Sequence, residues 1–369
     1  MSQYGFAVIG AGIAGASLAA ELAEYTSVLL LEAEERPGYH ATGRSAAFWE
    51  ECYGGPDIVP LTLASGPYLR EHGFLSERGA LYIGRNSDRL ALDAFIDRFA
   101  ATGATLVRLD RDALAERLPG LKPQWTGAVW EPACADIDVA TLHAHYLKLA
   151  GSRGVKLVTR ARVAALLGDT EGWTIRTERE DSFRVSNLAN AAGAWADEVA
   201  AMAGVRPRGI RPLRRTVAQL RVNPQPPPDL PLVLDIAGRF YFKSESGRLW
   251  LSPHDETPTA PCDAAPEEID VALAIERLGE VTDWRVERVE HRWAGLRSFS
   301  PDRLPVYGWD GEVERFAWFA GQGGYGIQTA PAAARLAAQL LLGKARDCLT
   351  RSLDAALYAP GRNALKKAS

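Results

Sequence analysis

The chain opens with two apolar runs separated by a stretch of small residues. Residues 4–9 and 27–32 are largely apolar, as buried strands are, whereas residues 12–24 place small and apolar side chains at helical spacing. The pattern therefore predicts a strand, a helix and a second strand, which is the usual opening of a parallel α/β sheet.

Farther along the chain, the hydrophobic period predicts an alternation of helices and short strands. Helices are expected at residues 88–102, 141–152, 267–278 and 329–342, and Asp138 is the expected N-cap of the second. Strands are expected at residues 79–84, 155–158, 161–167, 172–176, 183–188, 217–222, 239–243, 248–252, 303–308 and 316–320. Residues 36–55 show no clean period and are predicted to form a functional loop leading into a short helix. The polar, basic stretch 361–369 is predicted to be frayed.

Composition narrows the class of protein. A length of 369 residues exceeds what one core usually serves, so two domains are expected, and 47% hydrophobic and 24% charged residues are typical of a soluble globular protein. A net charge of −4 gives no reason to expect a nucleic acid or an anionic membrane as partner. The apolar runs are too short for a membrane span, and the first strand begins too early to leave room for a signal peptide.

The cysteines point to a reducing compartment. None of the four stands in a C-x-x-C arrangement, which argues against a zinc site and against a disulfide framework. We therefore expect a cytoplasmic protein without a bound metal. The four are Cys52, Cys134, Cys262 and Cys348.

The first strand and helix carry a dinucleotide-binding motif. Gly10, Gly12 and Gly15 follow the first apolar run with the spacing G-x-G-x-x-G, and Glu32 ends the second run. In such a motif the glycines permit a tight turn, a close approach to a pyrophosphate and close helix packing, while the acid accepts hydrogen bonds from a ribose. The pyrophosphate would lie at the positive end of the helix. The alternative is a glycine-rich turn with no ligand.

Four further segments resemble the D-amino-acid-oxidase-like family of flavoproteins, which includes glycine and sarcosine oxidases and bacterial D-amino-acid dehydrogenases. They are Gly43-Arg44-Ser45-Ala46, Asn190-Ala-Ala-Gly193-Ala-Trp195, Trp293-Ala-Gly-Leu-Arg297-Ser-Phe-Ser-Pro-Asp302 and Gly321-Gln-Gly-Gly-Tyr-Gly-Ile-Gln328. The resemblance covers nearly the whole chain. A nicotinamide enzyme would instead continue with strand-helix units after the second strand.

The resemblance implies FAD as the cofactor. It implies that Arg44 and Ser45 lie along the ribityl phosphate and flavin, and that Val163 lies against the adenine. Arg44 suits bidentate contact with a phosphate, although a surface ion pair is the alternative. Some members of the family attach the flavin through a cysteine, and residues 295–301 contain none, so FAD is expected to be non-covalent. The expected cofactor-binding residues are Gly10, Gly12, Ala14, Gly15, Glu32, Arg44, Ser45, Ala46, Val163, Gly193, Gly323, Gly324, Gly326, Ile327 and Gln328.

The glycine-rich segment 323–328 is predicted to open the helix that ends near residue 342. The N–H groups of a helix start carry partial positive charge, which would stabilise the anion formed when the flavin is reduced. The alternative is a turn that only allows a helix to pack closely.

The resemblance also implies which residues hold the substrate. Arg297 and Arg214 would clamp its α-carboxylate, assisted by the hydroxyls of Tyr53 and Tyr241, and the backbone carbonyl of Gly324 would accept its amine. Arg297 stands in an apolar setting where a guanidinium needs an anionic partner. Either arginine could instead hold an internal carboxylate, and Arg215 directly follows Arg214, so the register there is open. No general base stands out: His40, His143, His145 and His254 are all expected to be structural or surface residues.

The activity implied is oxidative deamination of a D-amino acid. A hydride would pass from the substrate Cα to flavin N5, and the imine would hydrolyse to a 2-keto acid and ammonia. The electron acceptor is O₂ or a quinone-type compound. The alternatives are a secondary-amine oxidase of the glycine or sarcosine type, a dehydrogenase of a 2-hydroxy acid such as 2-hydroxyglutarate, and an FAD-bearing subunit that needs a partner chain.

Within the family the chain looks most similar to the D-arginine dehydrogenase branch, with two departures. Phe48 replaces a histidine of that branch, and Ser87 stands at the apparent position of a glutamate that pairs with the cationic side chain of the substrate. A guanidinium left without that partner would cost several kcal/mol to bury. We therefore expect a substrate with a neutral side chain. Phe48 and Trp49 could line an apolar pocket or simply pack in the core, and Asn86, Glu50 or Glu51 could restore polarity if the register shifts.

The fold implied is α/β, with a discontinuous Rossmann-like FAD-binding domain and a substrate domain built on a mixed or antiparallel sheet. The first is expected to comprise residues 1–48, 136–205 and 291–369, and the second residues 49–135 and 206–290. The active site should lie between them.

Overall fold

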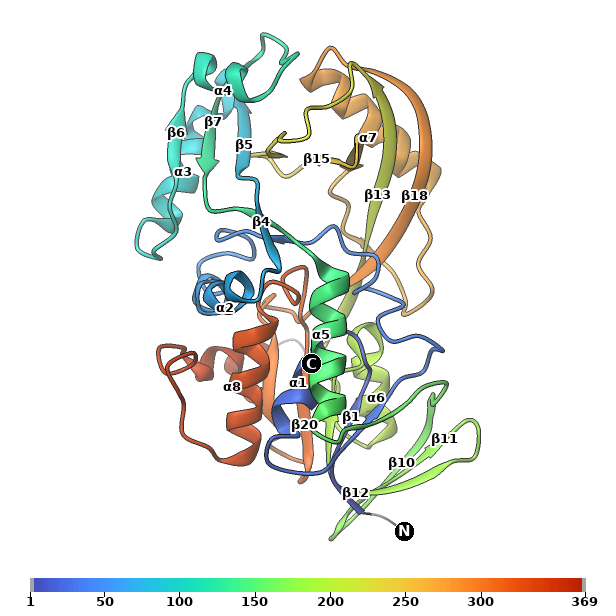
Figure 1. Ribbon diagram of the computed structural model, residues 1–369. Coiled ribbons are helices and arrows are strands. Elements are labelled where there is room, and N and C mark those ends of the chain that lie inside the picture. The colour runs from blue at the N-terminus through green and yellow to red at the C-terminus, as the bar shows by residue number, and fades with distance from the viewer. Residues whose placement is uncertain (1–2, 367–369) are drawn as a thin grey trace.

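The computed structural model describes residues 3–366 and is built on two large sheets, with a small third sheet near mid-height in Figure 1. The lower part of the figure holds the first strands and helix of the chain and residues 139–202, and the upper part holds residues 80–131 and 241–281. Two long strands, β13 and β18, run from the upper part down towards the lower one.

The lower sheet is mostly parallel. Its central order is β9-β2-β1-β12-β20, all parallel, and β19 closes one edge antiparallel to β20. A meander of β10 and β11 pairs antiparallel with the first half of β12. The strands are β1 (Gln3–Ile9), β2 (Val28–Leu31), β9 (Lys156–Val158), β10 (Val163–Asp169), β11 (Gly172–Thr177), β12 (Ser182–Asn190), β19 (Val306–Trp309) and β20 (Phe316–Ala320).

Both faces of the lower sheet are covered, because its central strands are apolar on both sides. Phe6 and Val8 of β1 pack in one core with helices α1 (Ile13–Leu22) and α8 (Ala330–Leu342). Ala7 and Ile9 point to the opposite core, which is shared with α6 (Ala196–Met202) and the meander. Helix α5 (Val139–Ser152) packs against α1, and the carboxylate of Asp138 caps it by accepting a hydrogen bond from Thr141 N.

The upper sheet has nine strands and mixes antiparallel pairs with one parallel pair, β5 with β14. Helices α4 (Arg111–Arg117) and α7 (Glu268–Val281) cover one face and α3 (Arg89–Phe99) the other. The strands are β5 (Ala80–Arg85), β6 (Val107–Leu109), β7 (Trp125–Glu131), β13 (Arg211–Asn223), β14 (Leu232–Asp235), β15 (Tyr241–Glu245), β16 (Arg248–Ser252), β17 (Thr257–Pro258) and β18 (Arg285–Phe299).

The alternation of side chains along β13 decides which of its residues reach a cavity. Ala218, Leu220 and Val222 pack in the core beneath α7, whereas Val217 lines a cavity on the opposite face. Because successive residues of a strand point to opposite faces, Arg215 shares the face of Val217.

Shorter elements complete the structure. The small sheet has the order β3-β8-β4. The remaining elements are β3 (Phe48–Trp49), α2 (Val59–Glu71), β4 (Leu75–Glu77), η1 (Asn86–Asp88), β8 (Ala135–Ile137), η2 (Gly193–Trp195), η3 (Ala355–Tyr358) and α9 (Asn363–Lys366).

The predicted α/β fold with a mixed second sheet is confirmed, and so is each predicted helix and strand to within a few residues. Several elements were not predicted, among them α2, α4, β14 and β18. The prediction of a frayed end is wrong for residues 363–366, which form α9 with Leu365 buried, while residues 367–369 lie outside the described part. The division into two domains stays a prediction; its boundary at residue 291 falls inside β18.

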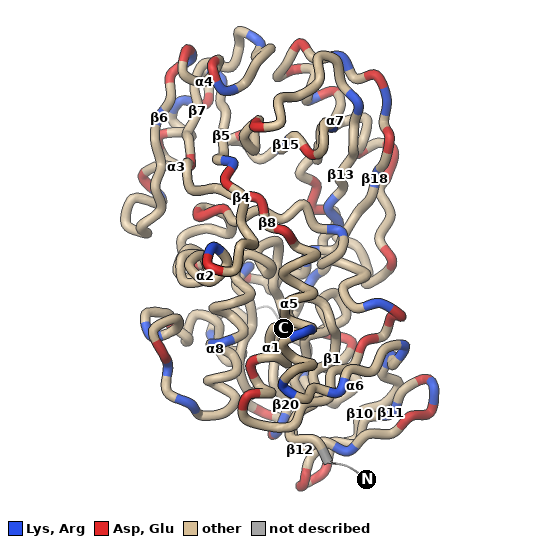
Figure 2. Tube along the Cα trace, viewed as in Figure 1, with Lys and Arg blue, Asp and Glu red and all other residues tan. Residues whose placement is uncertain are grey.

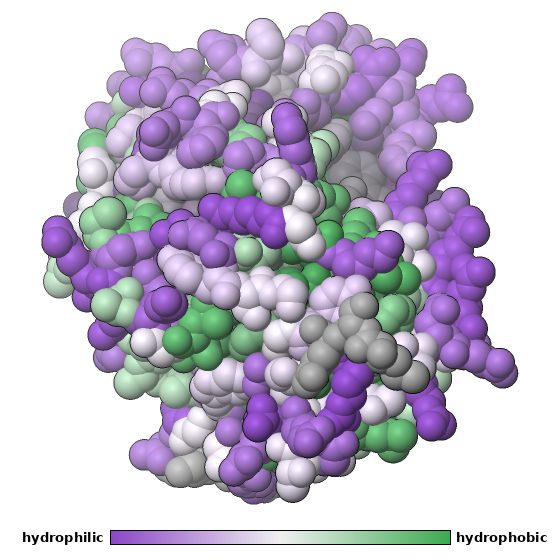
Figure 3. Space-filling model, turned by 60° about the horizontal axis from the view of Figure 1, so that its bottom comes forward, coloured by the Kyte–Doolittle hydropathy of each residue, from purple (hydrophilic) through white to green (hydrophobic). Residues whose placement is uncertain are grey.

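Charges of both signs are spread over the whole trace in Figure 2, consistent with the small net charge. On the face shown in Figure 3, hydrophilic residues surround smaller groups of hydrophobic ones. Among residues 3–366, no helix has the length and apolar character needed to cross a bilayer.

Candidate active site

A cavity of about 450 Å³ opens where β1, β2 and β12 end. This is the edge of a parallel sheet at which nucleotides bind in doubly wound folds, and the volume is in the usual range for a ligand pocket. A second cavity of about 90 Å³ adjoins it and shares Thr42, Arg44 and Gln322 as lining residues. The predicted residues that line the larger cavity are Gly10, Gly12, Ala14, Glu32, Arg44, Val163, Gly193 and Gly323. The predicted residues that line the smaller cavity are Arg44, Ser45, Ala46, Tyr241, Arg297, Gly323, Gly324, Gly326 and Ile327.

The turn from β1 into α1 needs glycine at two positions. Gly10 has φ +98°, a conformation that side chains disfavour, and a Cβ there would lie 2.6 Å from the carbonyl oxygen of Ala191. Gly15 lines neither cavity, and a Cβ on it would lie 1.7 Å from the carbonyl oxygen of Gly10. Gly12 is the N-cap of α1 and supplies no side-chain acceptor, so the helix start faces the cavity.

Three side chains hold this turn in shape. Glu32 accepts a hydrogen bond from Ala11 N at 2.9 Å, and Thr42 accepts one from Ile13 N at 3.0 Å. His143 of α5 lies 2.9 Å from the carbonyl oxygen of Ala11 through Nε2, and burial lowers the pKa of this imidazole, which keeps it neutral. Sequence reasoning missed Thr42 and His143, because neither belongs to the glycine motif and both come from elsewhere in the chain.

Arg44 lines both cavities, but protein groups occupy its guanidinium. It donates hydrogen bonds to the carbonyl oxygens of Ala264, at 2.8 Å, and Ala294, at 3.2 Å, and it pairs with Asp263. These contacts tie the segment around residue 263 to β18. The pair with the exposed Asp263 matches the alternative of a surface ion pair, so the expected contact with a phosphate would require some of these contacts to exchange.

The glycine-rich segment 323–328 does not open α8, which begins at Ala330; the prediction of a helix start near residue 323 is wrong. The segment instead forms turns that precede the helix and line the smaller cavity. Gln328 lines neither cavity. Its side-chain amide donates to the carbonyl oxygen of Glu50 at 3.0 Å and to Thr62 Oγ1 at 2.7 Å, which fixes the loop after β3 against this segment.

Arg215 and Arg297 form the positive centre of the smaller cavity. Leu213 of β13 pairs directly with Arg297 of β18, so Arg215, two residues on, shares the face of Arg297. Arg215 is 4% exposed and has no hydrogen-bond partner for Nη1. Burial, and then the like charge of Arg297, lower the pKa of Arg215. Two guanidiniums on one face, the buried Arg215 and the half-buried Arg297, with Arg215 incompletely paired, make a site for an anion.

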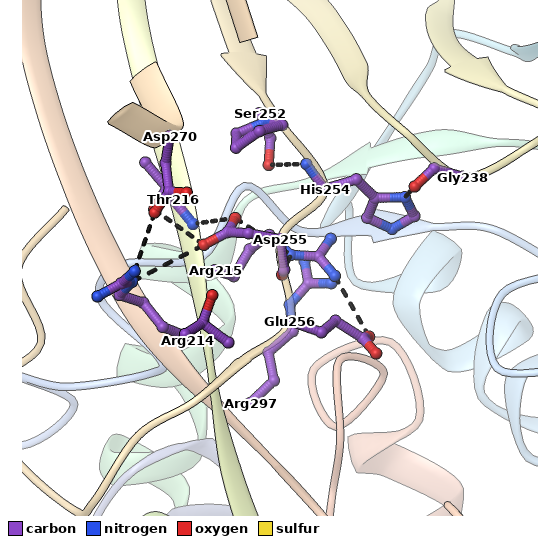
Figure 4. Close-up of polar contacts among 12 residues, drawn as sticks. Arg214, Arg215, Thr216, Gly238, Ser252, His254, Asp255, Glu256, Asp270 and Arg297 are labelled. Carbon is purple, nitrogen blue, oxygen red and sulfur yellow. Dashed lines mark hydrogen bonds and ion pairs between the residues drawn. The ribbon is translucent and has the colours of Figure 1, made fainter. Parts of the chain in front are cut away.

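Arg214 is not part of this site, which corrects the expectation that it clamps a substrate. It lies on the other face of β13, where it pairs with Glu267 and donates to Asp270 Oδ2 at 3.0 Å (Figure 4). These acids belong to the start of α7, so Arg214 holds an internal carboxylate pair, as one alternative allowed. Arg215 takes its expected place.

Two tyrosines contact the guanidinium pair, of which Tyr241 lines the smaller cavity and Tyr53 lines neither cavity. The hydroxyl of Tyr53 accepts a hydrogen bond from Arg297 Nη1 at 2.6 Å, and the Arg297 guanidinium lies 5.7 Å from the centre of the Tyr53 ring. A Cβ on Gly324 would lie 1.9 Å from that hydroxyl, so a glycine there permits the close approach of Tyr53. Tyr241 is buried, and its ring centre lies 5.9 Å from the guanidinium of Arg215.

The segment after β16 wraps around Arg215 (Figure 4). The carbonyl oxygen of Asp255 accepts from Arg215 Nε at 2.7 Å, and its carboxylate accepts from Thr216 N at 2.8 Å. Glu256 lies 3.4 Å from Arg215 Nη2 and also pairs with Arg303. Sequence reasoning missed this segment as part of the site, since its acidic residues read as an ordinary surface loop.

A pair of buried carboxyl groups lies behind the smaller cavity. Burial raises the pKa of Glu50 to about 7, although the hydroxyl of Tyr82 and the charge of Arg297 oppose the shift. Glu131 is fully buried, and burial and then the charge of Glu50 raise its pKa well above the usual range. Glu131 accepts a hydrogen bond from Glu51 N at 2.6 Å through one oxygen, and the other has no partner. At neutral pH the pair therefore holds at least one proton.

This pair should make stability depend on pH. The folded-state pKa of Glu50 is raised from a usual value of 4.5 to about 7, so its contribution is fully present below pH 4.5 and is lost as the pH rises through 7. The free energy of unfolding of Glu50→Gln, compared with that of the natural protein, should therefore rise by on the order of 3 kcal/mol from about pH 5 to about pH 8. Urea unfolding of both proteins at the two pH values measures the difference in their free energies of unfolding. The same difference at both pH values would contradict the prediction.

The residues that were expected to set the preference for the substrate's side chain line neither cavity. The ring of Phe48 lies 6.5 Å from that of Tyr241 and packs in the same core. Ser87 and Asn86 are both exposed in η1, and neither of them lines a cavity. Trp49 is buried and donates through its indole to the carbonyl oxygen of Thr62.

The residues of the larger cavity fit FAD. The N–H groups of Ala11 and Ile13 are bonded to Glu32 and Thr42, so a pyrophosphate would meet the helix start at Gly12 and Ala14, which line the cavity. Glu32 lies where a ribose would be held, and Val163 gives an apolar wall. The smaller cavity, with its guanidinium pair, adjoins this space.

Comparison with known proteins agrees with this geometry. The family model DAO, described as FAD dependent oxidoreductase, matches residues 6–340. L-2-hydroxyglutarate dehydrogenase of Escherichia coli (strain K12) is 26% identical over 254 residues, which are 63% of this chain and 60% of that enzyme, so the match spans about three fifths of the relative.

Solved structures share the fold over almost their whole length. Glycine oxidase from Geobacillus kaustophilus has a TM-score of 0.85 at 23% identity, covering 98% of this chain and 100% of that one. L-α-glycerophosphate oxidase from Mycoplasma pneumoniae, solved in the dithionite-reduced state with FAD bound, has a TM-score of 0.84 at 17% identity, with 93% and 95% covered. The chain belongs to the DAO family of FAD-dependent oxidoreductases, and FAD is its cofactor.

Proposed function

We propose that this chain oxidises the carbon next to the carboxylate of a small amino acid. The observation that carries the proposal is the pair formed by the buried Arg215 and the half-buried Arg297, on one face of neighbouring strands, with Nη1 of Arg215 unpaired. A carboxylate between the two guanidiniums would supply the missing acceptor and offset the cost of burying two like charges.

Residues at and next to the smaller cavity would orient this substrate. Tyr53 holds Arg297 in place through its hydroxyl, and Tyr241 forms the wall under Arg215. The carbonyl of Gly324, at the same cavity, is the proposed acceptor for the amine. When bound, FAD supplies the two-electron acceptor for the hydrogen of the α-carbon. The task of the protein is to exclude water and to direct that bond.

We further propose a D-amino acid with a neutral side chain, as the resemblance to the D-arginine dehydrogenase branch implies. Support for a neutral side chain comes from Tyr241, which lines the smaller cavity and meets the ring of Phe48 edge-on. Ser87 lines neither cavity, so it does not bear on this choice. Glu50 is buried and bonded to the hydroxyl of Tyr82, so it is not the counterpart of a cationic side chain.

A 2-hydroxy acid is the second candidate substrate. The same carboxylate clamp would hold it, and L-2-hydroxyglutarate dehydrogenase of Escherichia coli is among the relatives in sequence. A secondary amine, as in an oxidase of the glycine or sarcosine type, would also fit the clamp. O₂ or a quinone-type compound as electron acceptor, and the cytoplasm as location, are parts of the same proposal.

Anaerobic titration tests the proposal. The FAD-loaded protein is mixed with D- and L-amino acids, N-methyl amino acids and 2-hydroxy acids, and loss of flavin absorbance is followed. At least one D-amino acid should bleach the flavin, and its methyl ester should do so at least about tenfold more slowly, since an ester cannot pair with two guanidiniums. Reduction by hydroxy acids alone would favour the second candidate. No reduction by any compound would favour a subunit that needs a partner.

The attachment of FAD is a separate proposal. Residues 295–301 contain no cysteine, but the structure brings the half-buried Cys262 to the wall of the larger cavity. We keep non-covalent FAD as the proposal, because a thiol in the wall does not by itself make a bond. Acid precipitation should leave the yellow colour in the supernatant; colour in the pellet would contradict this, and its loss in Cys262→Ser would identify the link.

A further inference from the structure

Residues 259–264, which we call the strap, form part of the wall of the larger cavity. They follow β17, lie before the start of α7 and belong to no helix or strand. Cys262 and Ala264 of the strap line the cavity. Both pack in one apolar cluster with Ala194 of η2 and Leu296 of β18, which line the same cavity. The strap therefore completes the wall of this cavity next to η2 and β18.

The strap is anchored at its two ends and weakly held between them. At one end Thr259 N donates to the carbonyl oxygen of Pro212 at 3.1 Å, and just beyond the other end Glu267 pairs with Arg214 of the same strand, β13. Within the described part of the chain, no backbone-to-backbone hydrogen bond involves residues 260–266. The walls formed by β1, β2 and β12 are instead held in a sheet. Segments with few backbone hydrogen bonds open at the lowest free energy, so the strap is the wall that moves most easily.

One arginine fastens the strap. Nη1 of Arg44 donates to the carbonyl oxygen of Ala264 at 2.8 Å, and Nη2 of Arg44 pairs with Asp263. The same Nη1 donates to the carbonyl oxygen of Ala294 at 3.2 Å, which links the strap to β18. The hydroxyl of Tyr39 donates to Asp263 Oδ2 at 3.1 Å. Asp263 thus receives two side chains that line the larger cavity, although it lines neither cavity itself.

We propose that the strap is the movable wall through which FAD enters and leaves the larger cavity, and that Arg44 and Asp263 form the clasp that keeps it closed over the bound cofactor. When the strap opens, the contacts of Arg44 with Asp263 and Ala264 break and water replaces them. Arg44 then holds the wall rather than a phosphate of FAD, so its contacts need not exchange. Asp263 is a positioning residue, because any effect that it has on FAD must pass through the strap. The inference rests on FAD as the cofactor and does not depend on the substrate.

The first test measures how fast FAD is exchanged. The FAD-loaded protein is mixed with an excess of isotope-labelled FAD, and mass spectrometry of the bound flavin gives the rate. Exchange in Asp263→Ala should be at least about fivefold faster than in the natural protein, since Arg44 loses a charged partner and Tyr39 an acceptor. Glu280→Ala, which removes an acid paired with Arg85 at residues that line neither cavity, should exchange at the natural rate. An unchanged rate in Asp263→Ala, or the same acceleration in both variants, would overturn the inference.

The second test uses Cys262 to report whether the strap is closed. Iodoacetamide labels the thiols, and peptide mass spectrometry compares the half-buried Cys262 with the exposed Cys348. In the natural protein, excess FAD should slow the labelling of Cys262 relative to Cys348 at least about tenfold, because closed segments are protected from reagents. This comparison needs no variant, and equal labelling with and without FAD would overturn the inference. With FAD present, Asp263→Ala should label Cys262 at least about fivefold faster than the natural protein does, with Cys348 unchanged. Equal rates for the two FAD-loaded proteins would show that Asp263 is not part of a clasp.

Discussion

Replacing Arg215 with methionine is expected to abolish most of the activity, while the same change at the adjacent Arg214 leaves it nearly intact. Arg215→Met keeps the length of the side chain but removes one of the two charges that hold the carboxylate, and Arg297→Met removes the other. Losing one partner of a buried charged contact costs about 3–5 kcal/mol, or roughly a hundred- to several-thousand-fold in kcat/KM. The natural protein and both variants are compared by anaerobic stopped-flow with one substrate.

Arg214→Met is the matched control for this experiment. Its buried guanidinium pairs with Glu267, Asp270 and, at 3.9 Å, Asp255 on the face covered by α7. Its loss should therefore lower the stability of the fold by about 3–5 kcal/mol, but it should change kcat/KM far less than Arg215→Met does, because Arg214 lines neither cavity. All variants should keep FAD, which absorbance shows. Comparable losses in Arg214→Met and Arg215→Met would mean that the face of β13, and with it the clamp, has been assigned wrongly.

Gly15→Ala is expected to give a protein that does not retain FAD. A Cβ at Gly15 would lie 1.7 Å from the carbonyl oxygen of Gly10, a backbone atom that cannot turn aside. Helix α1 would have to move away from the end of β1, which deforms the turn that carries Gly10 and Gly12. Overpacking of this kind costs about 3 kcal/mol, so the unfolding temperature should fall and the purified variant should be colourless.

Gly279→Ala serves as the control for adding a methyl group. Gly279 lies in α7, and a Cβ there would meet no atom within 4 Å. Alanine is favoured over glycine inside a helix by about 0.5–1 kcal/mol, so this variant should be slightly more stable and fully yellow. A Gly15→Ala protein with normal FAD content would show that close packing of α1 on β1 is not needed for the site.

Local patterns allowed most of the fold to be predicted. The glycine spacing and the apolar runs of residues 4–32 identified β1, α1 and β2 and the edge of the sheet where the cofactor cavity lies. Strand β18 was missed because its first half carries charges on both sides, as an exposed edge strand does, and its partner β13 is far away in the sequence. The pairing of strands that lie far apart in the sequence depends on tertiary structure, and the local hydrophobic periodicity does not reveal it.

The substrate site was predicted less completely, for identifiable reasons. Whether Arg214 or Arg215 enters the cavity depends on which face of β13 lies beneath α7. Alternation along β13 contains this information, since Ala218 and Leu220 share the face of Arg214, but the sequence alone does not say which face is covered. The helix at residues 329–342 was placed correctly, but the glycines of 323–328 were taken for its first turn because glycines of a turn resemble those of a helix end. The charge states of Glu50 and His254 depend on burial and on neighbours from other strands.

The central claim is that a carboxylate lies between Arg215 and Arg297 next to FAD. The most direct measurement is a crystal structure of the FAD-loaded protein grown with acetate. We predict FAD in the larger cavity and an acetate ion whose oxygens accept hydrogen bonds from both guanidiniums, including Nη1 of Arg215. Acetate bound elsewhere while Arg215 and Arg297 pair with other groups of the protein would contradict the claim.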